Sequence, residues 1–287
     1  MKVISFSLEQ GNKYFGRVDG GPKFLIGSRV TYESNKGLMN VSGTSAQKYD
    51  RAAFRPTYGF WADFIHPTAM AEGALYHTLN TYDRARFTFT FLQYAAHVPN
   101  GDFVVFLRTL LQLPAAAEYF PDLKLEQGRI CKIDTGGLVP LESSSSTDLL
   151  MDYFNPSPTE VEDTEVIQAA RLIHWAQNDV AHRDAQIKVG IDHFQSKMKT
   201  YAKWYPTLNG APPEICLMIA DIHHQGRAKV STVLLALQGA NPLIELLKIG
   251  QSQYAERIAT LNKEIKALTA DGTFGSLKYD AASNAFI

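Results

Sequence analysis

The chain has 287 residues, of which 45% are hydrophobic and 20% are charged, and its formal net charge at pH 7 is -1. These values are typical of a globular protein with a substantial core, and they exclude any chain-wide electrostatic attraction to nucleic acid or to an anionic membrane. The two cysteines, Cys131 and Cys216, cannot build a disulfide framework, and both are expected to be buried thiols.

Residues 1–50 are predicted to form a β-rich N-terminal segment. Between Gly16 and Tyr32, β-branched and aromatic runs alternate with Gly and Pro, which is typical of hairpins. The first ten residues lack the apolar stretch of a signal peptide, and no run approaches the ~18 apolar residues of a membrane span. We therefore expect synthesis in the cytoplasm without a signal peptide, and no membrane span.

Residues 51–287 are predicted to form a helical domain, because apolar residues recur there at helical spacing. Residues 134–163 interrupt this pattern with Gly, Pro and a serine run, and a long loop is expected there, either a lid or a crossing between helical lobes. The expected fold class is α+β and mainly α, with a small β-hairpin region beside the β-rich N-terminal segment.

The segment Ala71–Gln93 carries the candidate catalytic residues. His66-Pro67 is predicted to open a helix and Gly73 to close it, which places Glu72 in the last helical turn. The helix dipole is negative at that end and disfavours an ionised carboxylate, which suits a general acid. Glu72 is therefore the first candidate for a catalytic acid.

A second carboxyl, Asp83, follows in a polar turn over residues 80–84. Residues 87–91 then alternate Phe with Thr, which indicates a half-buried strand or hairpin. Two carboxyls that flank one cleft are the basic equipment for glycoside hydrolysis. Three aromatic side chains could offer flat faces to sugar rings: Trp61, Tyr76 and Tyr82.

The order Glu72-Gly73, then Asp83, then Phe89-Thr90-Phe91-Leu92-Gln93 resembles the active-site stretch of the lysozyme-like superfamily. The resemblance is closest to goose-type lysozymes and lytic transglycosylases, and chitosanases share the same plan. In that superfamily a catalytic Glu ends a helix and precedes a Gly-Leu-Met-Gln element by about this distance. Ser commonly follows that Glu, where this chain has Gly73, and Gly usually stands at the position of Thr90.

The resemblance implies a lysozyme-like fold in which Glu72 protonates the glycosidic oxygen. It implies that Asp83 either activates water or stabilises charge while a group of the sugar itself attacks. No cofactor is expected. Six residues are expected to contact substrate: Asn80, Tyr76, Tyr82, Thr90, Gln93 and His97.

The activity implied is that of a peptidoglycan muramidase, either a lysozyme or a lytic transglycosylase. A chitosanase-like or chitinase-like hydrolase is the alternative within the enzyme class. The alternative outside it is a non-catalytic glycan-binding or phage-structural module of the same fold. A muramidase without a leader would reach the cell wall in the periplasm as a phage endolysin or as an exported toxin, and a toxin would need an immunity protein.

Glu33 is a rival acid because Glu33-Ser34 supplies the Glu-Ser pair that Glu72 lacks, although no helix precedes it. Metal binding is not expected at His223 and His224, since adjacent residues on a helix point about 100° apart. The stretch from Asp221 to Arg227 is interpreted instead as a wall of the cleft that binds sugar hydroxyls or braces the site.

Overall fold

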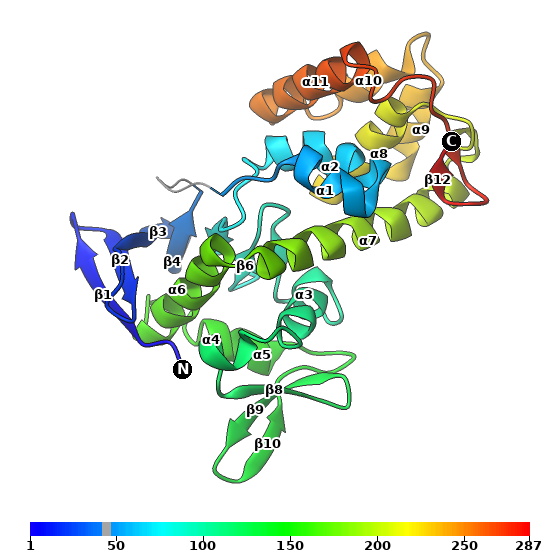
Figure 1. Cartoon of the computed structure of the whole chain (residues 1–287). Coiled ribbons are helices and arrows are strands. Elements are labelled where there is room, and N and C mark those ends of the chain that lie inside the picture. The colour runs from blue at the N-terminus through cyan, green and yellow to red at the C-terminus, as the bar shows by residue number, and fades with distance from the viewer. Residues whose placement is uncertain (42–46) are drawn as a thin grey trace. The chain divides into compact units, whose positions relative to one another are not determined.

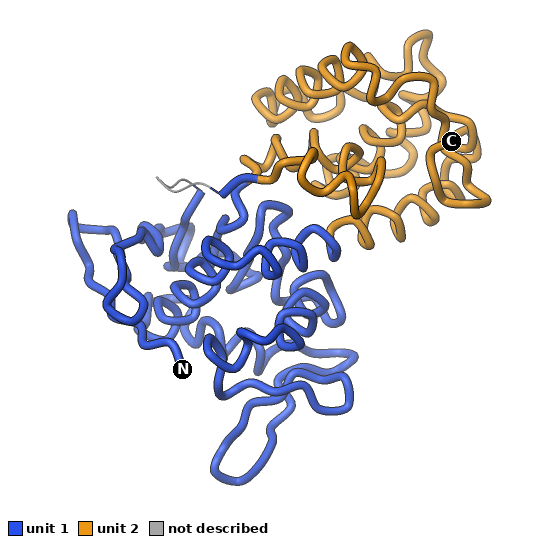
Figure 2. The backbone as a smooth tube through the Cα atoms, viewed as in Figure 1, with its two compact units in different colours: residues 1–48, 75–189 blue, residues 49–74, 190–287 orange. Residues whose placement is uncertain are grey.

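The computed structural model describes residues 1–41 and 47–287 and divides the chain into two compact units (Figure 2). Unit 1 comprises residues 1–48 and 75–189, and unit 2 comprises residues 49–74 and 190–287. Each unit is therefore built from two separate stretches of the sequence.

Over the described residues, unit 1 contains an antiparallel sheet of seven strands (Figure 1). Each strand of this sheet pairs with the next strand along the chain. Tight turns join the first strands. Asp19 and Gly20 have φ angles of 52° and 72°, and Glu33 has a φ angle of 54°. The strands are β1 (Ile4–Glu9), β2 (Lys13–Val18), β3 (Phe24–Tyr32), β4 (Asn35–Asn40), β5 (Leu79–Asn80), β6 (Thr88–Phe89) and β7 (Tyr94–Ala95).

The rest of unit 1 is a small three-stranded antiparallel sheet and a set of helices around an aromatic core. Phe87, Phe103 and Phe154 are fully buried, and their ring centroids lie 4.7 to 5.8 Å apart. The elements are β8 (Leu123–Glu126), β9 (Arg129–Asp134), β10 (Gly137–Pro140), α3 (Asp102–Leu110), α4 (Ala116–Tyr119), α5 (Asp148–Phe154), α6 (Asp163–Asn178) and the first part of α7 (Val180–Trp204).

Unit 2 is mainly helical and has a second aromatic core. Phe64 is fully buried, and its ring centroid lies 5.1 Å from those of Trp61 and Phe286. The elements are α1 (Arg51–Tyr58), α2 (Phe60–Ala71), the rest of α7, the 3-10 turn η1 (Pro206–Leu208), α8 (Pro213–Gln225), α9 (Val230–Leu237), α10 (Pro242–Lys248), α11 (Ala255–Ala270), β11 (Tyr279–Asp280) and β12 (Ala285–Phe286).

The fold is mixed α+β, and the expectation of a mainly helical chain is not confirmed. Strand β4 pairs with β5 in the register Met39 to Asn80 and Asn40 to Leu79, so the N-terminal sheet continues into the hairpin region. This pairing explains why the two units do not divide at residue 50. None of the helices in the described part of the chain is both long and apolar enough to cross a membrane.

Two local predictions are wrong. The long loop expected over residues 134–163 contains β10 and α5, because its apolar residues pair or pack despite the serine run between them. Helix α2 does not open at Pro67 but at Phe60, after Gly59. The buried apolar residues before Pro67 favour the earlier start, and the proline is accommodated inside the helix. Both Cys131 and Cys216 are buried free thiols, as predicted.

Candidate functional site

Glu72 lies directly after the last residue of α2, at the C-cap position. Gly73 follows with a φ angle of +85°, a left-handed conformation that favours glycine and ends the helix, as predicted. The backbone N–H of Glu72 donates to the carbonyl oxygen of Thr68 at 3.1 Å. The side chain of Glu72 is only 13% exposed, so its carboxylate lies largely inside unit 2.

Arg257, on the first turns of α11, joins Glu72 to a second carboxylate. Its Nη1 donates to Oε1 of Glu72. Its Nε and Nη2 donate to Oδ1 and Oδ2 of Asp221 on α8, at 3.2 and 2.7 Å. All three nitrogens of the guanidinium therefore donate to two carboxyl groups. The contact with Asp221 has the two-point geometry that Arg and carboxylates favour.

Asp221 is completely buried, and two further residues hold it. Arg227 pairs with its Oδ1 at 2.7 Å, and the hydroxyl of Thr68 donates to its Oδ2 at 3.0 Å. Burial alone would raise the pKa of Asp221, but the charges of Arg257 and Arg227 outweigh burial and hold the pKa below its ordinary value. Asp221 is therefore ionised at neutral pH.

This cluster, formed by Glu72, Arg257, Asp221 and Arg227, joins two guanidinium groups to two carboxyl groups. It connects the end of α2 with α8 and α11, and Thr68 adds a contact from α2 itself. A carboxylate held in this way has one orientation rather than the many rotamers of a surface Glu. The cluster can fix Glu72 for chemistry, and it can also serve as a purely structural brace.

A cavity of about 640 Å³ lies beside the cluster, within unit 2. Its lining includes the residues on both sides of Glu72 along the chain, and it includes Arg257 and the start of α11. This volume lies within the ~300–1,000 Å³ of typical small-molecule sites. The lining is polar with one aromatic side chain and includes Ala71, Gly73, Gln225, Ser252, Tyr254 and Arg257.

Asp83 lies in the loop between β5 and β6 of unit 1, where its carboxylate organises the turn. Its Oδ1 accepts from the backbone N–H of Ala85 at 2.8 Å, and its Oδ2 accepts from Asn80 at 3.0 Å. The side-chain oxygen of Asn80 in turn accepts from the backbone N–H of Tyr82 at 3.1 Å. Asp83, Asn80 and Tyr82 thus form one local hydrogen-bonded group.

Thr90 and Gln93 lie in the turn between β6 and β7. Thr90 is fully buried and has a φ angle of +83°, and its carbonyl oxygen accepts from the backbone N–H of Gln93 at 3.0 Å. Gln93 is exposed, with a φ angle of +55°. Positive φ is rare for any residue with a side chain and rarest for a β-branched one. The position that the resembled superfamily fills with Gly therefore has a backbone conformation that suits Gly.

The remaining candidates differ in their access to solvent. Tyr76 is buried against the ring of Phe91 at 5.6 Å and offers no open face to a sugar, and Trp61 belongs to the core of unit 2. His97 is partly buried, which lowers its pKa. Glu33, the rival acid, is exposed in the turn between β3 and β4.

The structure brings some predicted residues together and allocates others to different units. Glu72 belongs to unit 2, whereas Asp83 and all six predicted substrate contacts belong to unit 1. Within unit 2, Arg257 joins Glu72 to Asp221, which also pairs with Arg227; these two ends of the stretch were interpreted as part of a cleft wall that binds sugar hydroxyls or braces the site. Among the described residues, no group of three potential ligands is arranged to hold a metal ion.

Arg257 is the residue that sequence reasoning missed. It lies 185 positions after Glu72, inside an amphipathic helix with other charged residues, so no local pattern distinguishes it from a solvated Arg. Only the packing of α11 against α2 and α8 reveals its role.

The chain was compared with models of protein families, with curated proteins and with solved structures, and nothing matches in any of the three comparisons.

Proposed function

We propose that this protein is a glycan-cleaving enzyme of lysozyme-like type, with Glu72 as its general acid. The observation that carries the proposal is the environment of Glu72. A carboxyl at the end of α2 is held in one orientation by Arg257, which is itself held by the buried Asp221, next to a cavity of about 640 Å³. Catalytic groups need a fixed geometry beside a space that a substrate can enter, and to act as an acid Glu72 must take up a proton, which its contact with Arg257 disfavours.

The backbone at Thr90 gives further support. A β-branched residue at a φ angle of +83° is unusual, and the lysozyme-like active-site stretch has Gly at this position. The residues after Glu72 also form three short antiparallel strands, β5, β6 and β7, as the helix–hairpin plan of that superfamily requires. Both features belong to the segment on which the resemblance rests.

In the proposed reaction, Glu72 donates a proton to the glycosidic oxygen as the bond breaks. The anomeric carbon is then attacked by water, which inverts it, or by a group of the sugar itself, and Asp83 keeps only the role that the resemblance implies. Gln93, which is exposed, and Tyr82, which is partly exposed, keep the substrate-contact role that the resemblance implies. Peptidoglycan is the proposed substrate, and chitosan or chitin is the alternative polymer.

We further propose that the enzyme acts on the bacterial cell wall as an endolysin or an exported toxin. In the second case an immunity protein would protect the producing cell. These proposals follow from the substrate alone.

A non-catalytic glycan-binding or phage-structural module is the second candidate, and one observation favours it. Buried networks of Arg and carboxylates also occur as purely structural features. Glu142 in unit 1 is one example, since it is buried between Arg108 and Arg129 at 2.8 and 2.9 Å. The ion pair of Glu72 with Arg257 would then be a second structural network.

Zymography on several cell walls and on chitosan separates these candidates. We expect wild-type protein to clear at least one substrate, Glu72→Gln to clear none, and Glu33→Gln to clear as wild type does. Thermal unfolding of each variant shows that the loss is not a loss of fold. Clearing that persists in Glu72→Gln would refute the assignment of the acid, and no clearing of any substrate by wild type would favour the binding module.

A further inference from the structure

Strand β1 forms the outer edge of the seven-stranded sheet of unit 1 (Figure 1). It pairs with β2 on one side, and among the described residues no strand pairs with it on the other side. The edge of a sheet presents backbone N–H and C=O groups that a further strand can bind. β1 is therefore a place where another strand can join the sheet.

The contacts of Val3 show which backbone groups of β1 point to the open side. The carbonyl oxygen of Val3 accepts from the backbone N–H of Asp19, and the N–H of Val3 donates to Oδ1 of Asp19, both at 2.9 Å. Val3 thus points towards β2, and successive residues of an antiparallel strand alternate in this direction. The N–H and C=O groups of Ile4, Phe6 and Leu8 therefore point away from β2, and no backbone hydrogen bond joins them to a described residue outside this hairpin.

The other strand edges in the described part of the chain are short or carry features that discourage pairing. Strands β7, β11 and β12 have two residues each. In the three-stranded sheet, β10 ends in Pro140, and β8 carries Lys124 and Glu126. Charged side chains and proline are common means by which proteins protect an edge strand.

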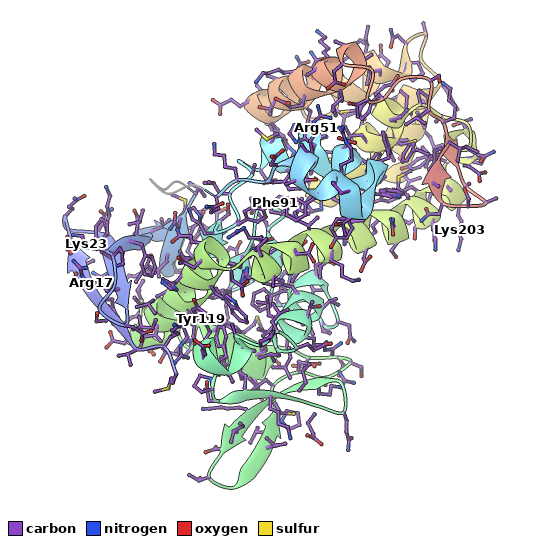
Figure 3. All side chains as sticks on the ribbon, in the orientation of Figure 1. Arg17, Lys23, Arg51, Phe91, Tyr119 and Lys203 are labelled. Carbon is purple, nitrogen blue, oxygen red and sulfur yellow. The ribbon has the colours of Figure 1, made fainter. Side chains whose placement is uncertain are left out.

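β1 has no such protection in its central part. From Ile4 to Leu8 it carries neither proline nor a charged residue. Arg17 and Lys23, the charged residues of this sheet that are labelled in Figure 3, lie on β2 and on the connection to β3. Leu8 is 43% exposed and Phe6 is only partly buried, so the open edge offers apolar surface as well as backbone groups.

The sequence of this stretch has the same pattern in both directions. Ile4-Ser5-Phe6-Ser7-Leu8 alternates apolar residues with serine about Phe6. In an antiparallel pair of two such strands, Phe6 opposes Phe6, Ile4 opposes Leu8, and Ser5 opposes Ser7. Apolar side chains then meet apolar ones and serine meets serine, and the outward backbone groups of β1 bond to one another in all three apolar pairs.

We propose that β1 is a self-association surface, through which two copies of this chain pair in this antiparallel register and join their sheets. Both copies use the same strand, so the assembly closes at two copies. The inference does not rest on the proposed activity of Glu72.

Cysteine substitutions at the two exposed serines test the register on the full chain, whose natural cysteines are both buried. In the proposed pairing, Ser5 opposes Ser7 of the second copy without mutual hydrogen bonds, at about 4.5 Å between Cα atoms, which a disulfide can span. Two Ser5 positions, or two Ser7 positions, are diagonal neighbours at roughly 7–8 Å and lie beyond that span. With oxidised glutathione, a mixture of Ser5→Cys and Ser7→Cys chains should therefore form linked dimers at least about tenfold faster than either variant alone.

Leu8→Pro tests the backbone contact. Because the N–H of Leu8 points away from β2, proline removes a hydrogen bond to the second copy and none within the hairpin. We expect sedimentation velocity to show a reversible monomer–dimer equilibrium for wild type, and dimerisation at least about tenfold weaker in Leu8→Pro. Leu8→Ala, the matched control, keeps the N–H and should weaken dimerisation less, and thermal unfolding of both variants checks the fold.

Three results would overturn the proposal. The first is a mixture of the cysteine variants that links no faster than each variant alone. The second is a wild-type chain that stays monomeric and forms no linked dimer, which would leave the edge to a strand of a different protein. The third is a folded Leu8→Pro variant that dimerises as well as Leu8→Ala does, which would exclude the backbone of β1 from the contact.

Discussion

Thr90 combines a β-branched side chain with a φ angle of +83°. Residues held in such regions cost of order 1–3 kcal/mol and persist only where the surroundings impose them. Here the imposing contacts are the backbone hydrogen bond from Thr90 to the carbonyl oxygen of Thr78 at 3.0 Å and the tight turn to Gln93. The hydroxyl of Thr90 offsets part of the cost by accepting from the N–H of Leu92 at 3.2 Å.

Replacing Thr90 with Gly should therefore be neutral or stabilising by up to about 1 kcal/mol, since relief of strain outweighs the added freedom of the unfolded chain. The matched change Thr88→Gly, at a buried threonine of β6 with ordinary φ, should destabilise by about 1–2 kcal/mol. Urea unfolding measures both. Equal destabilisation by the two substitutions would show that the backbone at Thr90 is not strained.

The surroundings of two buried glutamates shift their pKa values in opposite directions. Glu165, on α6, accepts a hydrogen bond from Thr81, and burial raises its pKa to about 8. Burial also opposes the ionisation of Glu142, but hydrogen bonds from Arg108, Arg129 and the backbone N–H of Ile130 hold its pKa below the ordinary value. Glu165 is thus protonated in the fold at neutral pH, and Glu142 is ionised.

Their contributions to stability therefore have opposite pH dependence. The folded pKa of Glu165 exceeds its unfolded value of about 4.5, so its contribution falls as pH rises from about 4.5 to about 8. Glu165→Gln should leave stability unchanged at pH 4.5 and increase it by a few kcal/mol at pH 8. Glu142→Gln, the matched control, should destabilise at pH 7, and this loss should diminish as pH falls through the acidic range.

Thermal unfolding between pH 4.5 and 9 provides the measurement for both variants. A Glu165→Gln variant that is no more stable than wild type at pH 8 would show that this carboxyl is ionised in the fold at no cost.

At the scale of elements, the packing of α2, α8 and α11 depends on a shared set of charges. Arg257 is 8% exposed and Asp221 is fully buried, so neither exchanges its partner for water. Burying charges is costly, and the compensation comes from the complete set of contacts, with Thr68 and Arg227 included. Removing one member leaves the others buried with incomplete partners.

Arg257→Met should consequently destabilise unit 2 by about 3–5 kcal/mol, because it leaves Asp221 and Glu72 without their common cation. Lys263→Met on the same helix is the matched control. Its side chain is 80% exposed, and the change should stay within about 0.5 kcal/mol. Chemical denaturation compares the two variants, and a loss for Arg257→Met as small as that of the control would contradict the account of this cluster.

At the scale of the whole molecule, the sequence predicts the helix ends and turns that depend on residues close together in the chain. The end of α2 at Gly73 follows from the conformational freedom of glycine, and the hairpins of the first forty residues follow from their turn residues. The start of α2 could not be predicted from Pro67, because burial of the preceding apolar residues overrides the usual position of proline. The pairing of β4 with β5 and the contact of Arg257 with Glu72 are long-range, and no local pattern encodes either of them.

The candidate site likewise combines a local order of residues with an arrangement that the local sequence does not encode. The order Glu72, Asp83, Gln93 is a property of the sequence, but the chain passes from unit 2 to unit 1 between Ala74 and Leu75, within that segment. Activity therefore has to be measured on the intact chain, with both units present.

The most direct test of the central claim is the release of reducing ends from purified peptidoglycan and from chitosan by the full chain. We predict release from at least one polymer by wild type and by Glu33→Gln, and a loss of at least about a hundredfold in Glu72→Gln, because a general acid contributes ~10²–10⁴ to the rate. A correctly folded Glu72→Gln variant that releases reducing ends at the wild-type rate would contradict the account.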